Sequence, residues 1–317
     1  ENQFALVFDM GGTNIRGAII DSAGTIMSRL TEPTGAAPLD TLLSIAAKLH
    51  AEAASEITGI GVAAAGIIDH QTGIILRSPN IPALTNTAPA ILLQERLGIK
   101  AQIVNDANAA ALGEKWLGSG SIFHNFVLLS LGTGIGCGVI LQDGLLPIAA
   151  EAGHMSIAND GPTCGCGNVG CLEQFASASA IISNAVAELQ KGTPSILRNL
   201  YQGNFYKMTS KDIYEAALEG DALARSVLRD AGRALGIGIA SLVNLFSPEA
   251  VIVTGGLTGA WKIYGEAASA EAGRRAMPEL FRRCQIVVSP VFDDAGLFGA
   301  ARLVFQNRNG KDDIRSL

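Results

Sequence analysis

The sequence predicts a duplicated α/β protein, in which two related domains have a cleft between them. Residues 4–24 read as an apolar strand, a Gly/Thr-rich turn, a second apolar strand and a glycine-containing turn, and residues 126–144 repeat that order. A repeat of this kind indicates a duplicated supersecondary unit. Helical periodicity alternates with short apolar runs in the rest of the chain, which is typical of α/β proteins.

Hydrophobic periodicity predicts the elements between the two copies. We expect, in order, a helix over 39–53, a buried strand over 57–63, a helix over 88–97, a strand over 101–104 and a helix over 107–117. Gly118 and Gly120 then mark the crossing from the first half to the second, because closely spaced glycines interrupt a helix.

The second half continues with helices and one more strand. Helical patterns cover residues 176–191 and 210–246, and we expect the longer pattern to break near Gly220 and Gly236, since glycine is a poor helix former. A strand over 248–256 then runs into another glycine turn.

These elements divide the chain into two domains, which its 317 residues allow. Residues 293–299 open the last helix, and the polar tail after Gln306 is expected to fray. We predict a smaller N-terminal α/β domain over 1–117, joined by a C-terminal helix over 295–317. A larger α/β domain over 118–294 carries a cysteine-rich loop.

Composition and charge limit the classes of partner. The net charge of −6 and the pI near 5.3 argue against nucleic acid, whose phosphates need a basic surface. The longest apolar run, 234–246, is too short to cross a bilayer and contains Ser241 and Asn244. No signal-peptide pattern precedes the first strand, and clustered thiols suit a reducing compartment. We therefore expect a cytoplasmic protein in which Cys137 and Cys284 are small core residues.

One histidine and three cysteines form the most specific motif of the chain, at His154, Cys164, Cys166 and Cys171. This is the Cys₃His set of closed structural zinc sites, and the glycines between the thiols allow tight turns towards one centre. Reduced thiols in a glycine-rich loop, or a disulfide pair, are the alternatives to Zn²⁺. Glu151 and Glu173 flank the motif, and a purely structural zinc loop has no need of them.

Three glycine turns follow apolar strands, at Gly11-Gly12-Thr13, Gly132-Thr133-Gly134 and Gly255-Gly256. Exposed backbone N–H groups in such turns can hold phosphate oxygens. Hairpin turns also use glycine for backbone reasons alone, but repetition at equivalent points of two halves favours phosphate binding. The sequence contains neither a Walker P-loop nor the dinucleotide fingerprint. Asp9, at the end of the first strand, is a candidate for holding Mg²⁺ through water.

Asn105 and Asp106 stand where a buried strand ends and a helix begins. An ordinary N-cap accounts for one such residue, because Asn and Asp are favoured at that position. Two adjacent polar residues indicate more than a cap. A carboxylate at this point, facing the cleft, can take a proton from an alcohol.

Several of these motifs together resemble the ROK family (repressors, open reading frames, kinases). They are Asp9-Met-Gly-Gly-Thr-Asn14, Val104-Asn-Asp-Ala-Asn108, Leu131-Gly-Thr-Gly134, Glu151-Ala-Gly-His154 and the cysteine motif over 164–173. The resemblance covers essentially the whole chain, and within the family it is strongest to the bacterial ATP-dependent glucokinases. It implies an actin-like ATPase (ribonuclease H-like) fold, with a zinc-bearing larger domain and a sugar in the cleft.

The resemblance also implies residue roles. Asp106 would be the general base on the sugar hydroxyl. The sugar would be bound by Gly66, Asn80, Asn105, Asp106, Glu151, His154 and Glu173. ATP and its Mg²⁺ would be surrounded by Asp9, Gly11, Gly12, Thr13, Thr133, Gly134, Gly255 and Gly256. Zn²⁺ would be held by His154, Cys164, Cys166 and Cys171. We expect the zinc loop to serve the sugar and to lie apart from the phosphate turns.

The implied reaction is the ATP-dependent phosphorylation of a free hexose, with glucose converted to glucose 6-phosphate. N-acetylmannosamine, or another hexose or N-acetylhexosamine, is the alternative substrate, and polyphosphate an alternative donor. A sugar-responsive repressor or a non-catalytic sugar sensor is the alternative of another class. Repressors of the family carry an N-terminal helix-turn-helix domain, for which the strand starting at Phe4 leaves no room. The family is often dimeric or tetrameric, which implies a homo-oligomer. From the acidic charge and the short apolar runs we expect no nucleic-acid or membrane partners.

Overall fold

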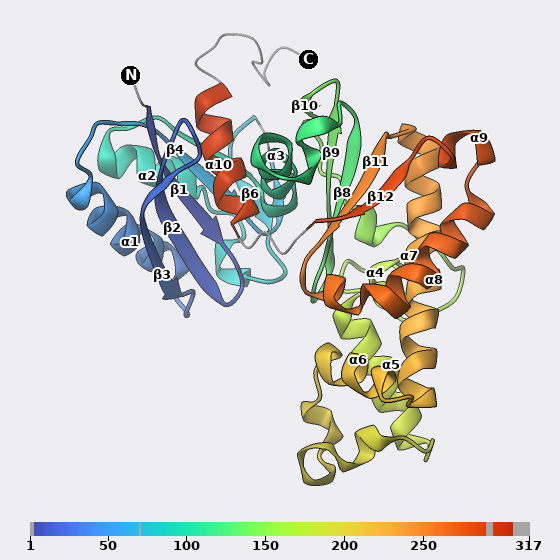
Figure 1. Cartoon of the computed structure of the whole chain (residues 1–317). Coiled ribbons are helices and arrows are strands. Elements are labelled where there is room, and N and C mark those ends of the chain that lie inside the picture. Colours follow the sequence, from blue (N-terminus) through green and yellow to red (C-terminus); the bar gives the residue numbers. More distant parts are fainter. Residues whose placement is uncertain (1–2, 70, 290–293, 307–317) are drawn as a thin grey trace. The chain divides into compact units, whose positions relative to one another are not determined.

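The computed structural model describes residues 3–69, 71–289 and 294–306 (Figure 1). The chain divides into two compact units. Unit 1 is drawn from Glu1–Asn125, Gly138–Ala150 and Phe292–Leu317, and unit 2 from Phe126–Cys137 and Glu151–Val291.

The first of two five-stranded sheets has the order β3-β2-β1-β4-β7. Its strands are β1 (Phe4–Met10), β2 (Asn14–Asp21), β3 (Ile26–Pro33), β4 (Ile57–Ala64) and β7 (Ala101–Asn105). The first three strands form an antiparallel meander, while β4 and β7 run parallel to β1 and to each other. A small hairpin of β5 (Ile67–Ile68) and β6 (Ile75–Arg77), which the sequence analysis missed, follows β4.

The second five-stranded sheet repeats this plan with the order β10-β9-β8-β11-β12. Its strands are β8 (Phe126–Leu131), β9 (Ile135–Leu141), β10 (Gly144–Leu145), β11 (Ala250–Thr254) and β12 (Gln285–Val288). The antiparallel meander is again followed by two parallel strands. The prediction of a duplicated α/β fold is therefore confirmed.

Helices cover both faces of the first sheet. Alternation along β1 sends Leu6 and Phe8 towards a core that contains Leu42 and Ile45 of α1 (Pro38–Glu52), and α2 (Pro89–Leu97) adds to the same core. The opposite face of the sheet carries Asp9 and is covered by α10 (Ala295–Gln306), which packs beside α3 (Asp106–Leu117) (Figure 1). The helices predicted in the first half begin and end within one or two residues of α1, α2 and α3.

The helices of unit 2 are α4 (Glu173–Ala176), α5 (Ala178–Gln190), α6 (Ser210–Leu218), α7 (Ala222–Phe246), α8 (Trp261–Arg275) and α9 (Pro278–Phe281). The predicted break near Gly220 is confirmed, because Asp221 caps a new helix by accepting from the backbone N–H of Ala224 at 2.8 Å. Short 3₁₀ helices complete the described chain, at Pro82–Leu84, Ser119–Ile122, Ala152–His154, Ile196–Gly203, Phe205–Lys207 and Gly256–Ala260.

The predicted break near Gly236 is wrong, because Gly236 lies inside the single 25-residue helix α7. Gly236 serves packing: a Cβ there would lie 2.5 Å from the backbone oxygen of Ala268 in α8, which lies alongside (Figure 1). The sequence analysis named no element over α8 and β12, since α8 packs through alanines and glycine and lacks a clear apolar stripe. Within the described residues, no helix combines the length and the apolarity that crossing a bilayer requires.

The other predicted elements have mixed outcomes. The helix expected over 176–191 is α5, which begins at Ala178 because Ser177 caps it by accepting from Ala180 N at 3.2 Å, and the short helix α4 ends just before that cap. The last helix begins at Ala295 and is described to Gln306. Asp293 and the predicted continuation to residue 317 lie outside the described residues.

Two glycines allow α3 and α10 to touch through their backbones. A Cβ at Gly299 of α10 would lie 1.7 Å from the backbone oxygen of Ala109 in α3, and a Cβ at Gly113 of α3 would lie 2.2 Å from that of Ala295. No real side chain fits such a distance. Since Asp106 is the first residue of α3, this close packing helps to fix where that carboxylate stands.

We expect Gly299→Ala to destabilise the protein by about 1–3 kcal/mol or more, because the added methyl group must push α3 and α10 apart. Urea unfolding measures the change. Gly259→Ala is the matched control, since a Cβ at Gly259 meets nothing within 4 Å. If both variants unfold at the same urea concentration as the parent protein, the close helix contact does not constrain this fold.

Candidate active site and metal centre

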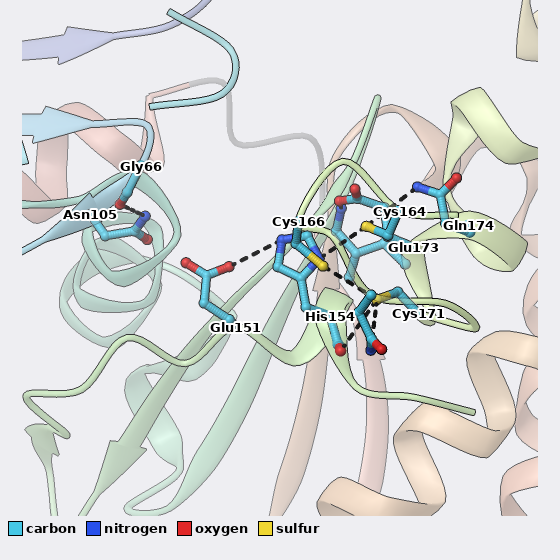
Figure 2. Close-up of polar contacts among 11 residues, drawn as sticks. Gly66, Asn105, Glu151, His154, Cys164, Cys166, Cys171, Glu173 and Gln174 are labelled. Atoms are coloured by element: carbon cyan, nitrogen blue, oxygen red, sulfur yellow. Dashed lines mark hydrogen bonds and ion pairs between the residues drawn. The ribbon is translucent and has the colours of Figure 1, made fainter. Parts of the chain in front are cut away.

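The four predicted zinc ligands lie together in unit 2 (Figure 2). His154 ends a short 3₁₀ helix, the cysteines follow in the loop, and the four ligand atoms all lie within 4.8 Å of one another. The Sγ atoms of Cys166 and Cys171 are 3.6 Å apart, so the disulfide alternative is not formed. His154 Nδ1 lies 3.5 Å from Cys164 Sγ.

These distances fit a zinc ion. With Zn–S near 2.3 Å and Zn–N near 2.0–2.1 Å, tetrahedral ligands stand about 3.6–3.8 Å apart. Side-chain amides also approach the sulfurs: Asn168 Nδ2 donates to Cys171 Sγ at 3.4 Å, and Gln174 Nε2 to Cys164 Sγ at 3.7 Å. Such donors stabilise thiolates, and hydrogen bonding from the Asn168 backbone lowers the pKa of Cys166. The sequence analysis missed both amides because they are not ligands themselves.

The loop folds through turns of its own backbone. Cys164 N donates to Asn168 O at 2.8 Å, and Gly167 N donates back to Cys164 O at 2.9 Å. Gly170 has a φ of +78°, and a Cβ there would lie 2.0 Å from the backbone oxygen of Ala158. Only glycine therefore allows the loop to close on itself just before its last cysteine.

The two acids that flank the metal loop have different surroundings. Glu151 is exposed, and its Oε2 lies 3.8 Å from His154 Nε2. The two ring nitrogens of His154 therefore face different partners, Nε2 the carboxylate of Glu151 and Nδ1 the thiol of Cys164 (Figure 2). Glu173 begins α4, and its Oε2 accepts from the backbone N–H of Ile135 at 2.8 Å. Ile135 directly follows the glycine turn at 132–134. The expectation that the metal loop lies apart from the phosphate turns is therefore wrong for that turn.

Asn105 is the N-cap of α3, as the simpler interpretation predicted. Its Oδ1 accepts from the backbone N–H groups of Ala107 and Asn108 at 2.9 and 3.2 Å. Its Nδ2 donates to the backbone oxygen of Gly66 at 3.0 Å (Figure 2). The amide oxygen of Asn105 is thus fully used by the fold, and one Nδ2 hydrogen is left for a ligand.

Asp106 is the first residue of α3 and is half-buried. Its Oδ1 accepts from the backbone N–H of Ala107 at 2.9 Å. A carboxylate in the first turn of a helix is stabilised by the unpaired N–H groups and the helix dipole. The Asn105 cap and the Gly66 contact hold the backbone from which this carboxylate projects.

Gly66 and Asn80 also lie in unit 1. Gly66 has a φ of +132°, and a Cβ there would lie 2.4 Å from the backbone oxygen of Arg77, so only glycine fits. Asn80 is exposed and adjoins the first glycine turn: a Cβ at Gly12 would lie 3.5 Å from Asn80 O. Unit 1 therefore brings Gly66 together with Asn105, and Asn80 together with Gly12.

The first glycine turn is held from behind by Thr34. The backbone N–H of Gly11 donates to Asn14 O at 3.0 Å, which closes the hairpin. Thr34 Oγ1 donates to Gly11 O at 2.6 Å, and Thr34 N donates to Thr13 O at 2.9 Å. Gly12 and Thr13 remain exposed at the tip of the turn, as a phosphate site requires.

The second and third glycine turns meet within unit 2. Gly132 N donates to Gly134 O at 3.0 Å, and Thr133 is exposed at the tip of that turn. Gly255 has a φ of +95°, and a Cβ there would lie 2.5 Å from the backbone oxygen of Leu131, just before the second turn. Gly256, the next residue, is the first of a 3₁₀ helix.

Asp9 is buried and forms an ion pair with Arg16, a partner that the sequence analysis missed. The two residues face each other directly across β1 and β2. The register of the predicted hairpin was therefore the sequence signal that could have revealed this ion pair. Burial raises the pKa of Asp9, and the nearby Arg16 opposes that rise. Arg16 also lies 3.9 Å from Asp294. A magnesium ion at Asp9 would have to share this carboxylate with a guanidinium group.

The two remaining cysteines are not reactive thiols. Cys137 is buried, and burial raises its pKa to about 12. Cys284 is half-buried, and burial raises its pKa to about 11. Because the thiolate is the nucleophile, both are inert at neutral pH.

Comparison with known proteins gives one consistent family. The chain matches the ROK family over residues 5–307. A glucokinase of Thermotoga maritima is 34% identical over 309 residues, an alignment that covers 95% of this chain and 97% of the relative.

Solved structures agree. A ROK family glucokinase from Streptomyces griseus, in complex with glucose and AMPPNP, superposes with a TM-score of 0.81 at 31% identity, over 96% of this chain and 99% of that one. A ROK family transcriptional regulator, a homologue of the E. coli MLC protein, gives a TM-score of 0.86 at 28% identity, over 97% of this chain and 79% of that one. These matches show the actin-like ATPase fold for the two repeated sheets.

Proposed function

The chain belongs to the ROK family and is an ATP-dependent sugar kinase, and we propose that glucose is the sugar that it phosphorylates, giving glucose 6-phosphate. The observation that carries the proposal is the near full-length similarity to the Thermotoga maritima glucokinase, 34% identical over 95% of this chain. The complex of the Streptomyces griseus enzyme with glucose and AMPPNP, at 31% identity, supports both the sugar and the nucleotide.

Asp106 is the general base in this proposal. It accepts the proton of the sugar 6-hydroxyl as the oxygen attacks the γ-phosphorus of ATP, and ADP leaves. Phosphoryl transfer asks a protein mainly for positioning and charge stabilisation, so a single well-placed base suffices. The Asn105 cap and the start of α3 support this role, because both fix the carboxylate before a sugar arrives.

Glucose is held by hydrogen bonds to its individual hydroxyls. A site that distinguishes epimers needs several carboxylates and amides, each satisfied by one hydroxyl. Asp106 itself also binds the sugar, and the other proposed ligands are Gly66, Asn80, Asn105, Glu151, His154 and Glu173. The exposed carboxylate of Glu151 and the one free Nδ2 hydrogen of Asn105 support this set.

ATP is held by the three glycine turns through their backbone N–H groups. The proposed residues are Asp9, Gly11, Gly12, Thr13, Thr133, Gly134, Gly255 and Gly256. Mg²⁺, when bound, neutralises phosphate charge, and Asp9 is its proposed anchor through water. Burial raises the pKa of Asp9, and the ion pair with Arg16 opposes that rise and so favours the charged carboxylate that a metal would need.

Zn²⁺ is the proposed occupant of the site made by His154, Cys164, Cys166 and Cys171. The ligand distances and the amide donors to two sulfurs support it. Four protein ligands leave no open position for catalysis at such a site. The ion therefore shapes the loop on which Glu151 and Glu173 stand.

A regulator is the second candidate function, because the transcriptional regulator superposes with a TM-score of 0.86. N-acetylmannosamine is the second candidate substrate. Turnover separates these possibilities, since a sensor binds a sugar without phosphorylating it.

With ATP and Mg²⁺, we expect kcat/KM for glucose to exceed that for N-acetylmannosamine by about tenfold or more, since one misfitting group costs on the order of 1–3 kcal/mol. A coupled assay for ADP over a panel of hexoses and N-acetylhexosamines measures it. A higher kcat/KM for N-acetylmannosamine would replace glucose as the substrate. Sugar binding without turnover of any sugar would favour the sensor.

Asp106→Asn should lower kcat by about 10²–10⁴-fold or more, because the amide keeps the shape but cannot accept the proton. Asp40→Asn is the matched control: Asp40 is also in the first turn of a helix of unit 1, but it is exposed and unconnected with the site. Circular dichroism verifies that both variants fold. If Asp106→Asn retains more than a tenth of the parental kcat, Asp106 is only a sugar ligand.

Purified protein should contain one zinc ion per chain by elemental analysis. Structural zinc contributes on the order of 10–16 kcal/mol to folding its own loop in small domains, so Cys166→Ser should lose both the metal and the order of the loop. Cys284→Ser, the same change at a cysteine outside the cluster, should keep the metal. A fully active preparation free of zinc would contradict this assignment.

A further inference from the structure

We propose that Glu173 is a positioning residue that holds the second glycine turn (Gly132-Thr133-Gly134) in its phosphate-binding shape, and so links the metal loop to the nucleotide. This inference rests on the proposed nucleotide role of that turn. It adds to the proposed role of Glu173 in binding sugar, and it does not depend on which sugar is phosphorylated.

The Glu173 carboxylate lies directly on the turn. Its Oε2 accepts from Ile135 N at 2.8 Å, and a Cβ at Gly134 would lie 2.4 Å from the same oxygen. Gly134 has no positive φ, so the requirement for glycine here comes from the nearness of the carboxylate and not from the backbone conformation. The absent side chain of Gly134 is what admits Glu173.

Two further contacts hold the same turn, from the segments on either side of the proposed metal ligands. A Cβ at Gly153 would lie 2.4 Å from the backbone oxygen of Ile135, and Ala178 N donates to Gly132 O at 2.9 Å. Gly153 immediately precedes the ligand His154, and Glu173 stands two residues after the ligand Cys171. One ion bound by this cluster would therefore fix the loop on both sides of its contacts with the turn.

The negative charge of Glu173 does not explain why a carboxylate lies beside a turn that binds phosphate. A negative charge beside a phosphate-binding turn repels the phosphates. What supports nucleotide binding is thus the length of the Glu173 side chain and its ability to accept a hydrogen bond from Ile135 N. Shortening the side chain should then weaken nucleotide binding, whereas neutralising it at its original length should not.

Two variants separate reach from charge. Glu173→Asp keeps the charge but is one methylene too short to reach Ile135 N, whereas Glu173→Gln keeps an acceptor oxygen at the original length. Glu151→Asp is the matched control, since Glu151 also flanks the metal loop but its carboxylate faces His154. Each purified protein is checked for zinc content and melting temperature.

The measurement is the Kd of AMPPNP with Mg²⁺, by calorimetry without any sugar. We expect Glu173→Asp to weaken AMPPNP binding by about fivefold, the size of effect that a lost hydrogen bond produces. Glu173→Gln and Glu151→Asp should stay within about twofold of the parent protein by the same reasoning. Hydrogen exchange over residues 126–137 should rise in Glu173→Asp alone.

The proposal is overturned if Glu173→Asp binds AMPPNP as the parent protein does, or if Glu173→Gln loses as much affinity as Glu173→Asp. Because no sugar is present, these outcomes are independent of whether glucose is the substrate. Failure of the parent protein to turn over glucose would overturn the proposed substrate and leave the nucleotide titrations decisive for Glu173.

Discussion

The hydrogen bonds of the Asn105 side-chain amide hold together the part of unit 1 that carries the proposed general base, Asp106. The amide oxygen caps α3 and the amide nitrogen holds the backbone of Gly66, a residue that no side chain could replace. One planar group thereby joins the end of β7, the start of α3 and the segment after β4. This junction fixes the position of Asp106 at the start of α3. The close contact of α3 with α10 fixes the position of the helix itself.

In unit 2 the loop that carries the Cys₃His cluster has the corresponding role in the proposed site. Its backbone carries two acids with separate surroundings, one facing His154 and the other resting on a glycine turn. Under the proposed function, this loop both carries sugar ligands and, through Glu173, holds a neighbouring turn. In the proposed site, loss of one metal ligand would affect the binding of both substrates, because the same loop also contacts the second glycine turn.

Much of this could be predicted from sequence, for physical reasons. The duplicated sheets were visible because strand, glycine turn and strand recur in the same order, and the Cys₃His set was visible because few other functions need those groups so close together. The continuation of α7 through Gly236 could not be predicted, because glycine is required there by the close packing of α8, a contact that the local pattern does not show. The contact of Glu173 with Ile135 likewise depends on how the loop closes, which local patterns do not encode, whereas the register of the first hairpin could have revealed the pairing of Arg16 with Asp9.

The two glycine turns that begin the repeated halves share one more property. In the first half, Thr34 donates two hydrogen bonds to the turn from just after β3, and in the second half Gly153, from the segment after β10, packs closely against the backbone of Ile135, which directly follows the turn. The support thus comes from the same place in both copies of the meander. Because this place lies outside the strand ladder of both meanders, one copy carries the long Cys₃His loop while both sheets keep the same strand order.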